Sequence, residues 1–291
     1  MLSKLMKYEW KNLSRQFLIM LAVLVGTTLI SSLMVVSINF DFDQVNNSYS
    51  LFMLIGSILI YYLGLIVCSF GTSLIIAIRF YKSCYTDEGY LTHTLPVSAR
   101  QLVGAKTLSA CLIQLLCMVS ILLSLIIYGA VIIAAVVNSG SAHYAGSFSL
   151  ALINTEFQQE LGIGLVQYCA FMLIYCIIGC ITGPSIILGC VSLGQFYTRH
   201  RILGAILAYF IVTMIMQFVT YIAMLPTYSK LIIASASGKT LPMMSIMMPT
   251  FIIVFVITII IAIAMYFINI HMMTSKSVSY THLTLPTILL V

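Results

Sequence analysis

The sequence predicts an all-α, polytopic membrane protein with six transmembrane helices and with both termini in the cytoplasm. Two observations predict this class. Of the 291 residues, 62% are hydrophobic and only 7% are charged, whereas a soluble domain carries about 25% charged residues. The mean hydropathy of +1.13 comes from long apolar runs that lack the alternation of barrel strands. A soluble enzyme and a disordered chain are therefore excluded.

Six segments reach the roughly 20 apolar residues that a helix needs to cross the hydrocarbon core. Each must be helical, because the backbone finds no water to bond with inside the bilayer. In chain order the predicted spans are 17–40, 51–78, 108–137, 162–193, 202–225 and 248–270. Together they predict one transmembrane domain over residues 1–276.

Lysine and arginine set the predicted orientation, because they accumulate on the cytoplasmic side of a membrane protein. Eleven of them lie in the N-terminal segment, the second and fourth connections and the C-terminal segment, and only Lys230 and Lys239 lie on the opposite face. The outer loops without basic residues carry acids instead, namely Asp41, Asp43, Glu156 and Glu160. Both termini are therefore predicted to be cytoplasmic.

The segment before the first span is amphipathic. Apolar residues recur there at helical spacing, opposite a basic face: Leu2, Leu5, Met6, Trp10 and Leu13. This pattern predicts a short N-terminal helix in the cytoplasmic interface; a plain basic anchor is the alternative. We expect no cleavable signal peptide, because the apolar stretch after Arg15 exceeds the length of about 7 to 15 residues of a signal core.

The predicted spans contain no Asp, Glu, Lys, Arg or His. Proton relays and ion pumps are built from such residues, and proteases inside the membrane need a base or metal ligands, so these functions are disfavoured. Gln114, Gln167 and Gln217 are expected to form hydrogen bonds between helices.

Seven of the eight cysteines lie inside predicted spans and Cys84 lies in a cytoplasmic loop, so we expect no structural disulfide. Cys169, Cys176 and Cys180 share one helical face. No His or carboxylate accompanies them, and we interpret them as small packing residues. We expect this chain to bind neither a metal nor a cofactor.

Residues 237–240 read Ser-Gly-Lys-Thr, like the end of a phosphate-binding loop. That motif requires a glycine where this chain has Ile233, so the chain is predicted to have no ATPase of its own and not to be an enzyme.

The fourth span contains a GxxxG step, Gly179 and Gly183, followed directly by Pro184. The proline predicts a kink near Gly183. Close packing within this chain is the favoured interpretation of the glycines, and a dimer face is the alternative.

The outer connection 226–249 is apolar but contains three prolines, which predicts half-helices that re-enter the outer leaflet.

The loop between the second and third spans runs from Arg79 to Lys106. Pro96 stops the preceding element, and Ser98 can cap a helix over residues 99–108. We expect this helix to stand in the cytoplasm as a docking element; a solvated loop is the alternative.

Three blocks of this sequence resemble the permease subunits of type-2 ATP-binding-cassette (ABC) exporters of Gram-positive bacteria, over about residues 1–276. The blocks are Lys7-Tyr8-Glu9-Trp10, the stretch from Glu88-Gly89-Tyr90-Leu91 to Thr94-Leu95-Pro96-Val97-Ser98, and Gly194-Gln195-Phe196 with His200-Arg201-Ile202-Leu203. The resemblance implies a plasma-membrane subunit that forms half of a dimeric domain. It also implies that the loop between spans two and three enters a cleft of a separate ATPase. The residues that would face the ATPase are Asp87, Glu88 and the stretch 96–106, above all Pro96, Val97, Ser98, Arg100 and Gln101.

The composition changes after Lys276. Residues 277–287 resemble an in-frame translation of a sequencing adaptor, and we interpret residues 277–291 as a non-native tail. A native tail with an apolar end is the alternative.

The leading hypothesis is a permease subunit that dimerises, binds a cytoplasmic ABC ATPase through residues 79–106 and exports an unidentified amphipathic or peptide substrate. The alternative is a membrane-embedded scaffold or sensor subunit that recruits a cytoplasmic partner without transport. A stand-alone carrier ranks third, because the two halves of the chain show no obvious repeat.

Overall fold

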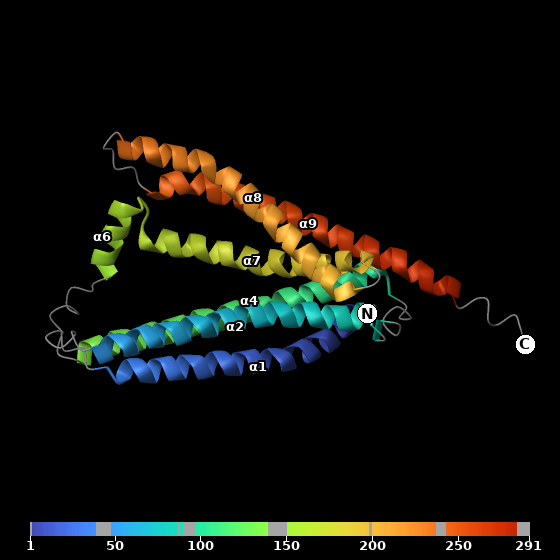
Figure 1. The fold of residues 1–291 in the computed structure, drawn as a ribbon, viewed down its shortest axis with the longest axis horizontal. Helices are drawn as coiled ribbons and strands as arrows, with labels where there is room; N and C mark the ends of the chain where they lie inside the picture. Colours follow the sequence, from blue (N-terminus) through green and yellow to red (C-terminus); the bar gives the residue numbers. More distant parts are fainter. Residues whose placement is uncertain are drawn as a thin grey trace, which may run out of the picture. The chain divides into compact units, whose positions relative to one another are not determined.

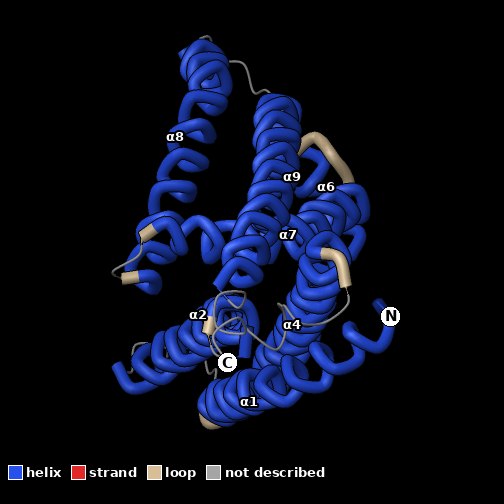
Figure 2. The backbone as a smooth tube through the Cα atoms, turned by 90° about the vertical axis from the view of Figure 1, so that its right-hand side faces the viewer, coloured by secondary structure: helices blue, strands red, loops and turns tan. Residues whose placement is uncertain are grey.

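The computed structural model describes residues 2–38, 48–86, 88–89, 97–138, 150–197, 200–236 and 243–283. Its helices are α1 (Leu2–Val36), α2 (Ser48–Tyr85), α4 (Ala99–Asn138), α6 (Leu150–Glu160), α7 (Leu165–Leu193), the 3-10 helix η2 (Gly194–Phe196), α8 (Arg201–Ala236) and α9 (Met243–Leu283) (Figure 1). No strand occurs among the described residues (Figure 2). The all-α prediction is confirmed for this part of the chain.

Six of these helices are long and apolar enough to cross a membrane, which confirms the number of predicted spans. Their membrane-competent stretches are Met6–Val36, Ser50–Tyr85, Ala99–Val137, Leu165–Phe196, Arg201–Ile233 and Ile246–Thr274. Four of the six run well past the predicted edges, because a helical backbone does not stop where the apolar run stops. Charged residues such as Glu9, Arg79 and Lys106 therefore belong to the spanning helices themselves.

The chain divides into two compact units. Unit 1 comprises Met1–Leu13, Ser73–Leu112 and Ile177–Val291, and unit 2 comprises Ser14–Thr72 and Ile113–Cys176. The long helices α1, α2, α4 and α7 each contribute one part to unit 1 and one part to unit 2.

Unit 2 is held together by aromatic and hydroxyl contacts between α1, α2 and α4. The Tyr61 and Tyr128 rings stack with their centroids 4.2 Å apart, and Val35 of α1 is buried against them. The two phenol groups are hydrogen-bonded to serines of the opposite helix, at 3.1 Å for Tyr61 with Ser124 and at 3.2 Å for Tyr128 with Ser57. Each ring is therefore buried while its hydroxyl stays satisfied, as packing between helices requires.

Unit 1 depends on close approaches at glycines. A Cβ atom on Gly194 of η2 would lie 2.3 Å from the backbone nitrogen of Ala205 in α8, and one on Gly204 would lie 2.6 Å from the carbonyl oxygen of Gly194. Only glycine fits at both positions. The Gly194-Gln195-Phe196 block, which is part of the resemblance to ABC permeases, is thus the point where η2 meets the start of α8.

Two segments that were predicted as separate helices are the first turns of longer ones. Residues 2–14 continue into the first span as α1, and residues 99–108 continue into the third span as α4. The prediction of a free-standing helix over 99–108 is wrong, because its apolar residues Leu102, Val103 and Ala105 are buried inside unit 1. The interfacial position of residues 2–14 stays a prediction.

The outer connection 226–249 also differs from its prediction. α8 continues through Pro226 to Ala236, and α9 already begins at Met243, so the described residues extend two spanning helices rather than forming half-helices. Thr227 and Thr250, which directly follow two of the prolines, are hydrogen-bonded to each other and join α8 to α9. Residues 237–242 lie outside the described chain.

The glycines of the fourth span are open. α7 is continuous through Pro184, and a Cβ atom on Gly179 or Gly183 would meet no atom within 4 Å. The favoured interpretation, close packing within this chain, is therefore wrong for both glycines in the described structure. The kink at Pro184 stays a prediction. The proposed tail boundary at Lys276 falls inside α9, which ends at Leu283, and residues 284–291 lie outside the described chain.

Gly189 of α7 tests the packing of unit 1. A Cβ atom there would lie 2.7 Å from the Met265 Cβ and 3.0 Å from its carbonyl oxygen, so Gly189→Val should lower the free energy of unfolding by about 1 to 3 kcal/mol. Thermal unfolding in detergent measures the loss. Gly129→Val is the matched control, because a Cβ atom there meets nothing within 4 Å. An equal loss for both variants would contradict the packing described.

Candidate functional site

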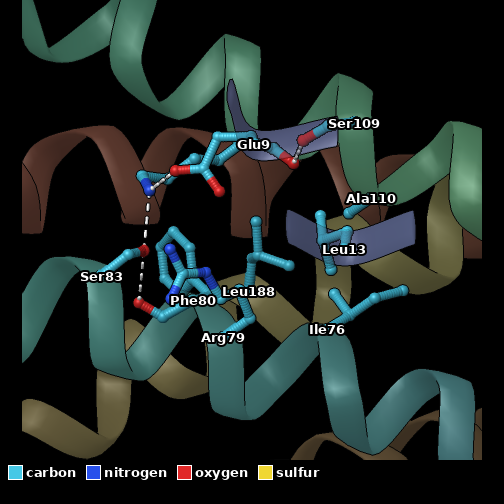
Figure 3. A pocket seen from close by; sticks show the side chains of 10 residues that line it. Glu9, Leu13, Ile76, Arg79, Phe80, Ser83, Ser109, Ala110 and Leu188 are labelled. Atoms are coloured by element: carbon cyan, nitrogen blue, oxygen red, sulfur yellow. Dashed lines mark hydrogen bonds and ion pairs between the residues drawn. The ribbon is translucent and has the colours of Figure 1, made fainter. Parts of the chain in front are cut away.

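The candidate site lies in unit 1, where the first turns of α1 and α4 meet the last turns of α2 and the second half of α7 (Figure 3). These segments include the first turns of α1 and both ends of the 79–106 loop, whose cytoplasmic position stays a prediction. The residues that line the site are Glu9, Leu13, Ile76, Arg79, Phe80, Ser83, Lys106, Ser109, Ala110 and Leu188.

A buried ion pair is the centre of the site. Lys106 Nζ donates a hydrogen bond to Glu9 Oε1 at 2.5 Å and another to Ser83 Oγ at 2.7 Å. Ser83 Oγ in turn donates to the Phe80 carbonyl at 3.3 Å, and Figure 3 shows this chain of bonds beginning at Glu9. The side chain of Lys106 is 4% exposed and that of Glu9 is 14% exposed. One ammonium group thus joins α1, α2 and α4.

The intact pair adds little to stability, but removal of one partner costs much. Bringing both charges out of water costs about as much as their attraction returns, so the pair adds little net stability. Removing one partner leaves an uncompensated buried charge, which costs about 3 to 5 kcal/mol. The pair therefore fixes which residues of the three helices face each other.

Arg79 makes a second polar link beside the first. Its Nη1 donates to Glu88 Oε2 at 3.2 Å, and the Asn12 amide, with its oxygen turned toward the guanidinium, accepts from Nη2 at 2.5 Å. The Arg79 side chain is 20% exposed, whereas that of Glu88 is 57% exposed. A partner protein could therefore reach Glu88 without disturbing the buried end of the pair.

Most of the individually predicted docking residues that the structure describes are exposed, and we call Glu88, Ser98, Arg100 and Gln101 the rim. Ser98, Arg100 and Gln101 are exposed and Val97 is half-buried. Ser98 caps α4 as predicted, because its Oγ accepts from the Gln101 backbone nitrogen at 3.4 Å and its carbonyl accepts from the Leu102 nitrogen at 3.1 Å. The other predicted contacts, Asp87 and Pro96, lie outside the described residues.

Gly89 has a structural role in the same rim. Its backbone nitrogen donates to the Thr86 carbonyl at 2.7 Å, and a Cβ atom there would lie 2.6 Å from the Cys84 carbonyl oxygen. Any side chain would push this turn away from the end of α2. The glycine of the Glu-Gly-Tyr-Leu block is therefore what lets Glu88 fold back toward Arg79.

A further polar chain fastens the last turn of α2 to α7 and α9. Tyr85 Oη donates to Ser192 Oγ at 2.9 Å, and Ser192 Oγ donates to Asn269 Oδ1 at 2.7 Å. All three residues are buried. Sequence reasoning assigned such bonds to glutamines, but Gln217 and Gln167 are exposed, and Gln167 Oε1 accepts from Gly164 beside its own helix at 3.3 Å.

The space at the site is small. The pocket between these helices is partly open, and its interior has room for about one water molecule. These residues hold four helices together at one point.

Sequence reasoning missed the ion pair, because it took Lys106 as a cytoplasmic positive charge and as the last residue of the stretch that would face the ATPase. In the structure Lys106 is buried. A usable signal was present. Glu9 is the one acid among the four basic residues before the first predicted span, and it lies in a block that was singled out by resemblance. Glutamate is rarely buried unless it is paired, so a buried position for this acid would require a cationic partner.

Among the residues that the structure describes, no group of three or more His, Cys, Asp or Glu side chains is placed to hold a metal ion. Comparison of the chain with family models, with curated proteins and with solved structures gives no match.

The ion pair can be tested by a double-mutant cycle. Glu9→Gln and Lys106→Met should each lower the free energy of unfolding in detergent by about 3 to 5 kcal/mol, because each leaves the other partner buried without its counter-charge. The double variant should lose clearly less than the sum of the two.

Lys82→Met is the control for this cycle. Lys82 is exposed in the last turn of α2, and its loss should change stability by no more than about 0.5 kcal/mol. Strictly additive losses for Glu9 and Lys106 would show that the two side chains are not coupled.

Proposed function

We propose that this chain is the permease subunit of an ABC exporter, which dimerises and couples to a separate cytoplasmic ATPase through the 79–106 loop. The observation that carries the proposal is the exposed rim of Glu88, Ser98, Arg100 and Gln101 beside a buried ion pair that ties three spanning helices together. The resemblance of the 88–98 block to ABC permeases supports the same assignment.

Docking at the rim would act on the first turn of α4. Arg100 and Gln101 are exposed there, while Val103 and Lys106, one to two turns further along the same helix, are buried. A helix transmits an axial push or a rotation over such a short distance without bending. A displacement of the rim would thus reach Lys106 and, through Lys106, Glu9 of α1 and Ser83 of α2.

Such coupling needs two states. An ATPase can drive the permease between inward-facing and outward-facing states only if it binds the two states with different affinity. In this proposal the Glu9–Lys106 pair stays intact in both states, so α1, α2 and α4 move as one block at this end. Nucleotide hydrolysis belongs to the partner.

The second subunit is proposed to cover apolar surface that this chain leaves open. The most apolar stretch of α8 has no buried residue, and a methyl group added at Gly179 or Gly183 of α7 would have no neighbour within 4 Å in the described chain. Small residues allow close helix contact between membrane proteins, so we propose a homodimer or a heterodimer with a similar subunit. The path for an amphipathic or peptide substrate would lie along surfaces that the second subunit completes.

The test is co-purification in detergent of the chain with each ABC ATPase of the source organism, beginning with any that is encoded next to it. Binding affinity is then measured for two variants, one at an acid on the predicted cytoplasmic side and one at an acid on the predicted outer side. Glu88→Lys reverses the charge of the rim and should weaken ATPase binding by about tenfold or more, as loss of an interfacial charge pair does. Glu156→Lys is the matched control, because Glu156 is exposed in α6 and is predicted to face the outside. It should leave binding unchanged.

Thermal unfolding of both variants separates docking from folding, since Glu88 is also bonded to Arg79. Equal effects of the two substitutions on binding would contradict the assigned docking rim. Failure of the intact chain to bind any ABC ATPase would favour the scaffold or sensor alternative.

A further inference from the structure

Two cysteine thiols of unit 2 lie against each other in the interior of the spanning helices. Cys68 of α2 and Cys117 of α4 are 49 positions apart in the sequence, and their Sγ atoms are 3.8 Å apart. Both side chains are fully buried, with 0% exposure, and both are free thiols. Their proximity is independent of the docking rim and of the function proposed above.

Two hydroxyl groups are bonded at this pair: Ser120 Oγ donates to the Cys117 carbonyl at 2.7 Å, and Thr72 contacts both cysteines. Thr72 Oγ1 lies 3.4 Å from Cys117 Sγ and donates to the Cys68 carbonyl at 2.7 Å. The predicted spans 51–78 and 108–137, which contain both thiols, have no Asp, Glu, Lys, Arg or His. Binding of a ligand that gives the cysteine pair a net charge would be strongly unfavourable, because these spans contain no charged side chain that could compensate a buried charge.

The separation of the two sulfur atoms fits a single soft centre bonded to both. With bonds of about 2.3 Å, the length of a zinc–thiolate bond, and an angle between a right angle and the tetrahedral value, two sulfurs on one centre lie roughly 3.3 to 3.8 Å apart. The observed 3.8 Å is at the upper end of this range. A disulfide, in contrast, would have to bring the sulfurs to about 2.0 Å and would need an oxidant.

We propose that Cys68 and Cys117 form a dithiol site for a trivalent arsenical. In the reaction with an organoarsenic(III) oxide, two As–S bonds form and two S–H bonds break. The arsenic-bound oxygen leaves with both protons as water, and arsenic stays in its +3 state. Reagent and product are both neutral, so the reaction suits a buried site whose spans carry no charged side chain, whereas a divalent cation would have to enter as an ion and expel two protons to bind the two thiolates.

The test uses phenylarsine oxide as the probe and the full chain in detergent, with the number of bound arsenicals per chain measured by intact mass. Cys68→Ala and Cys117→Ala should each bind one arsenical fewer than the unmodified chain. Cys190→Ala is the matched control, since Cys190 is also buried but lies in unit 1, and it should bind the same number as the unmodified chain. The arsenical at the site should be released by the dithiol dithiothreitol and not by an equal thiol concentration of mercaptoethanol, because chelation by two sulfurs resists a monothiol.

A second variant isolates the site. With the other six cysteines replaced by alanine, the chain should still bind one arsenical, and adding Cys68→Ala should abolish binding. The proposal is overturned if the chain with only these two cysteines elutes as folded protein and binds none, or if Cys68→Ala and the unmodified chain bind equal numbers. Should the six-fold variant fail to fold, the comparison of the single variants decides by itself.

Discussion

A lysine ammonium that is withdrawn from water needs a counter-charge, and this requirement organises the end of the fold that carries the candidate site. Lys106 meets it with Glu9 and with the hydroxyl of Ser83. Because the three residues belong to α4, α1 and α2, the requirement fixes the mutual register of three spanning helices. The nearby link from Arg79 to Glu88 and the chain from Tyr85 through Ser192 to Asn269 add α7 and α9 to the same polar framework. The charged residues of this site are thus each placed with a partner or on the exposed rim.

The position of the rim relative to the ion pair determines how a partner that docks at the rim could move the spanning helices. The residues of the rim are exposed, and the residues one or two turns further along α4 are buried and bonded to other helices. An isolated helix in a cytoplasmic loop would transmit little of a push from a partner. A helix whose first turn is the rim and whose second turn holds the ion pair has no flexible joint between the two, which is why the proposed coupling is placed here.

The helix class and the number of spans could be predicted from the sequence, because apolar runs of spanning length leave the backbone no alternative to a helix. The cap at Ser98 could be predicted as well, since it depends only on neighbouring residues. The residues at which the helices begin and end could not be predicted. Residues 2–14 and 99–108 looked like separate elements because their charge differs from the spans, yet the backbone continues through both. Pro226 and Pro249 were likewise interpreted as helix breaks, but α8 and α9 continue through them.

Contacts between residues that are far apart in the chain could not be predicted from the sequence. Glu9 and Lys106 are 97 positions apart, Tyr61 and Ser124 are 63 apart, and Cys68 and Cys117 are 49 apart. Each of these residues has an ordinary local explanation, as a surface charge, an apolar aromatic or a small packing residue. The glycines of α7 show the converse: GxxxG spacing indicated close packing within the chain, and the structure leaves that face open.

The most direct measurement of the central claim is hydrogen–deuterium exchange of the full chain in detergent, compared between the unmodified protein and Glu9→Gln. If the ion pair holds three helices in register, the substitution on α1 will speed amide exchange in residues 79–85 of α2 and 99–108 of α4, while exchange around the Tyr61–Tyr128 stack of unit 2 stays unchanged. If faster exchange is confined to the residues around position 9, the start of α4 is not coupled to the N-terminus, and the account of this site is wrong.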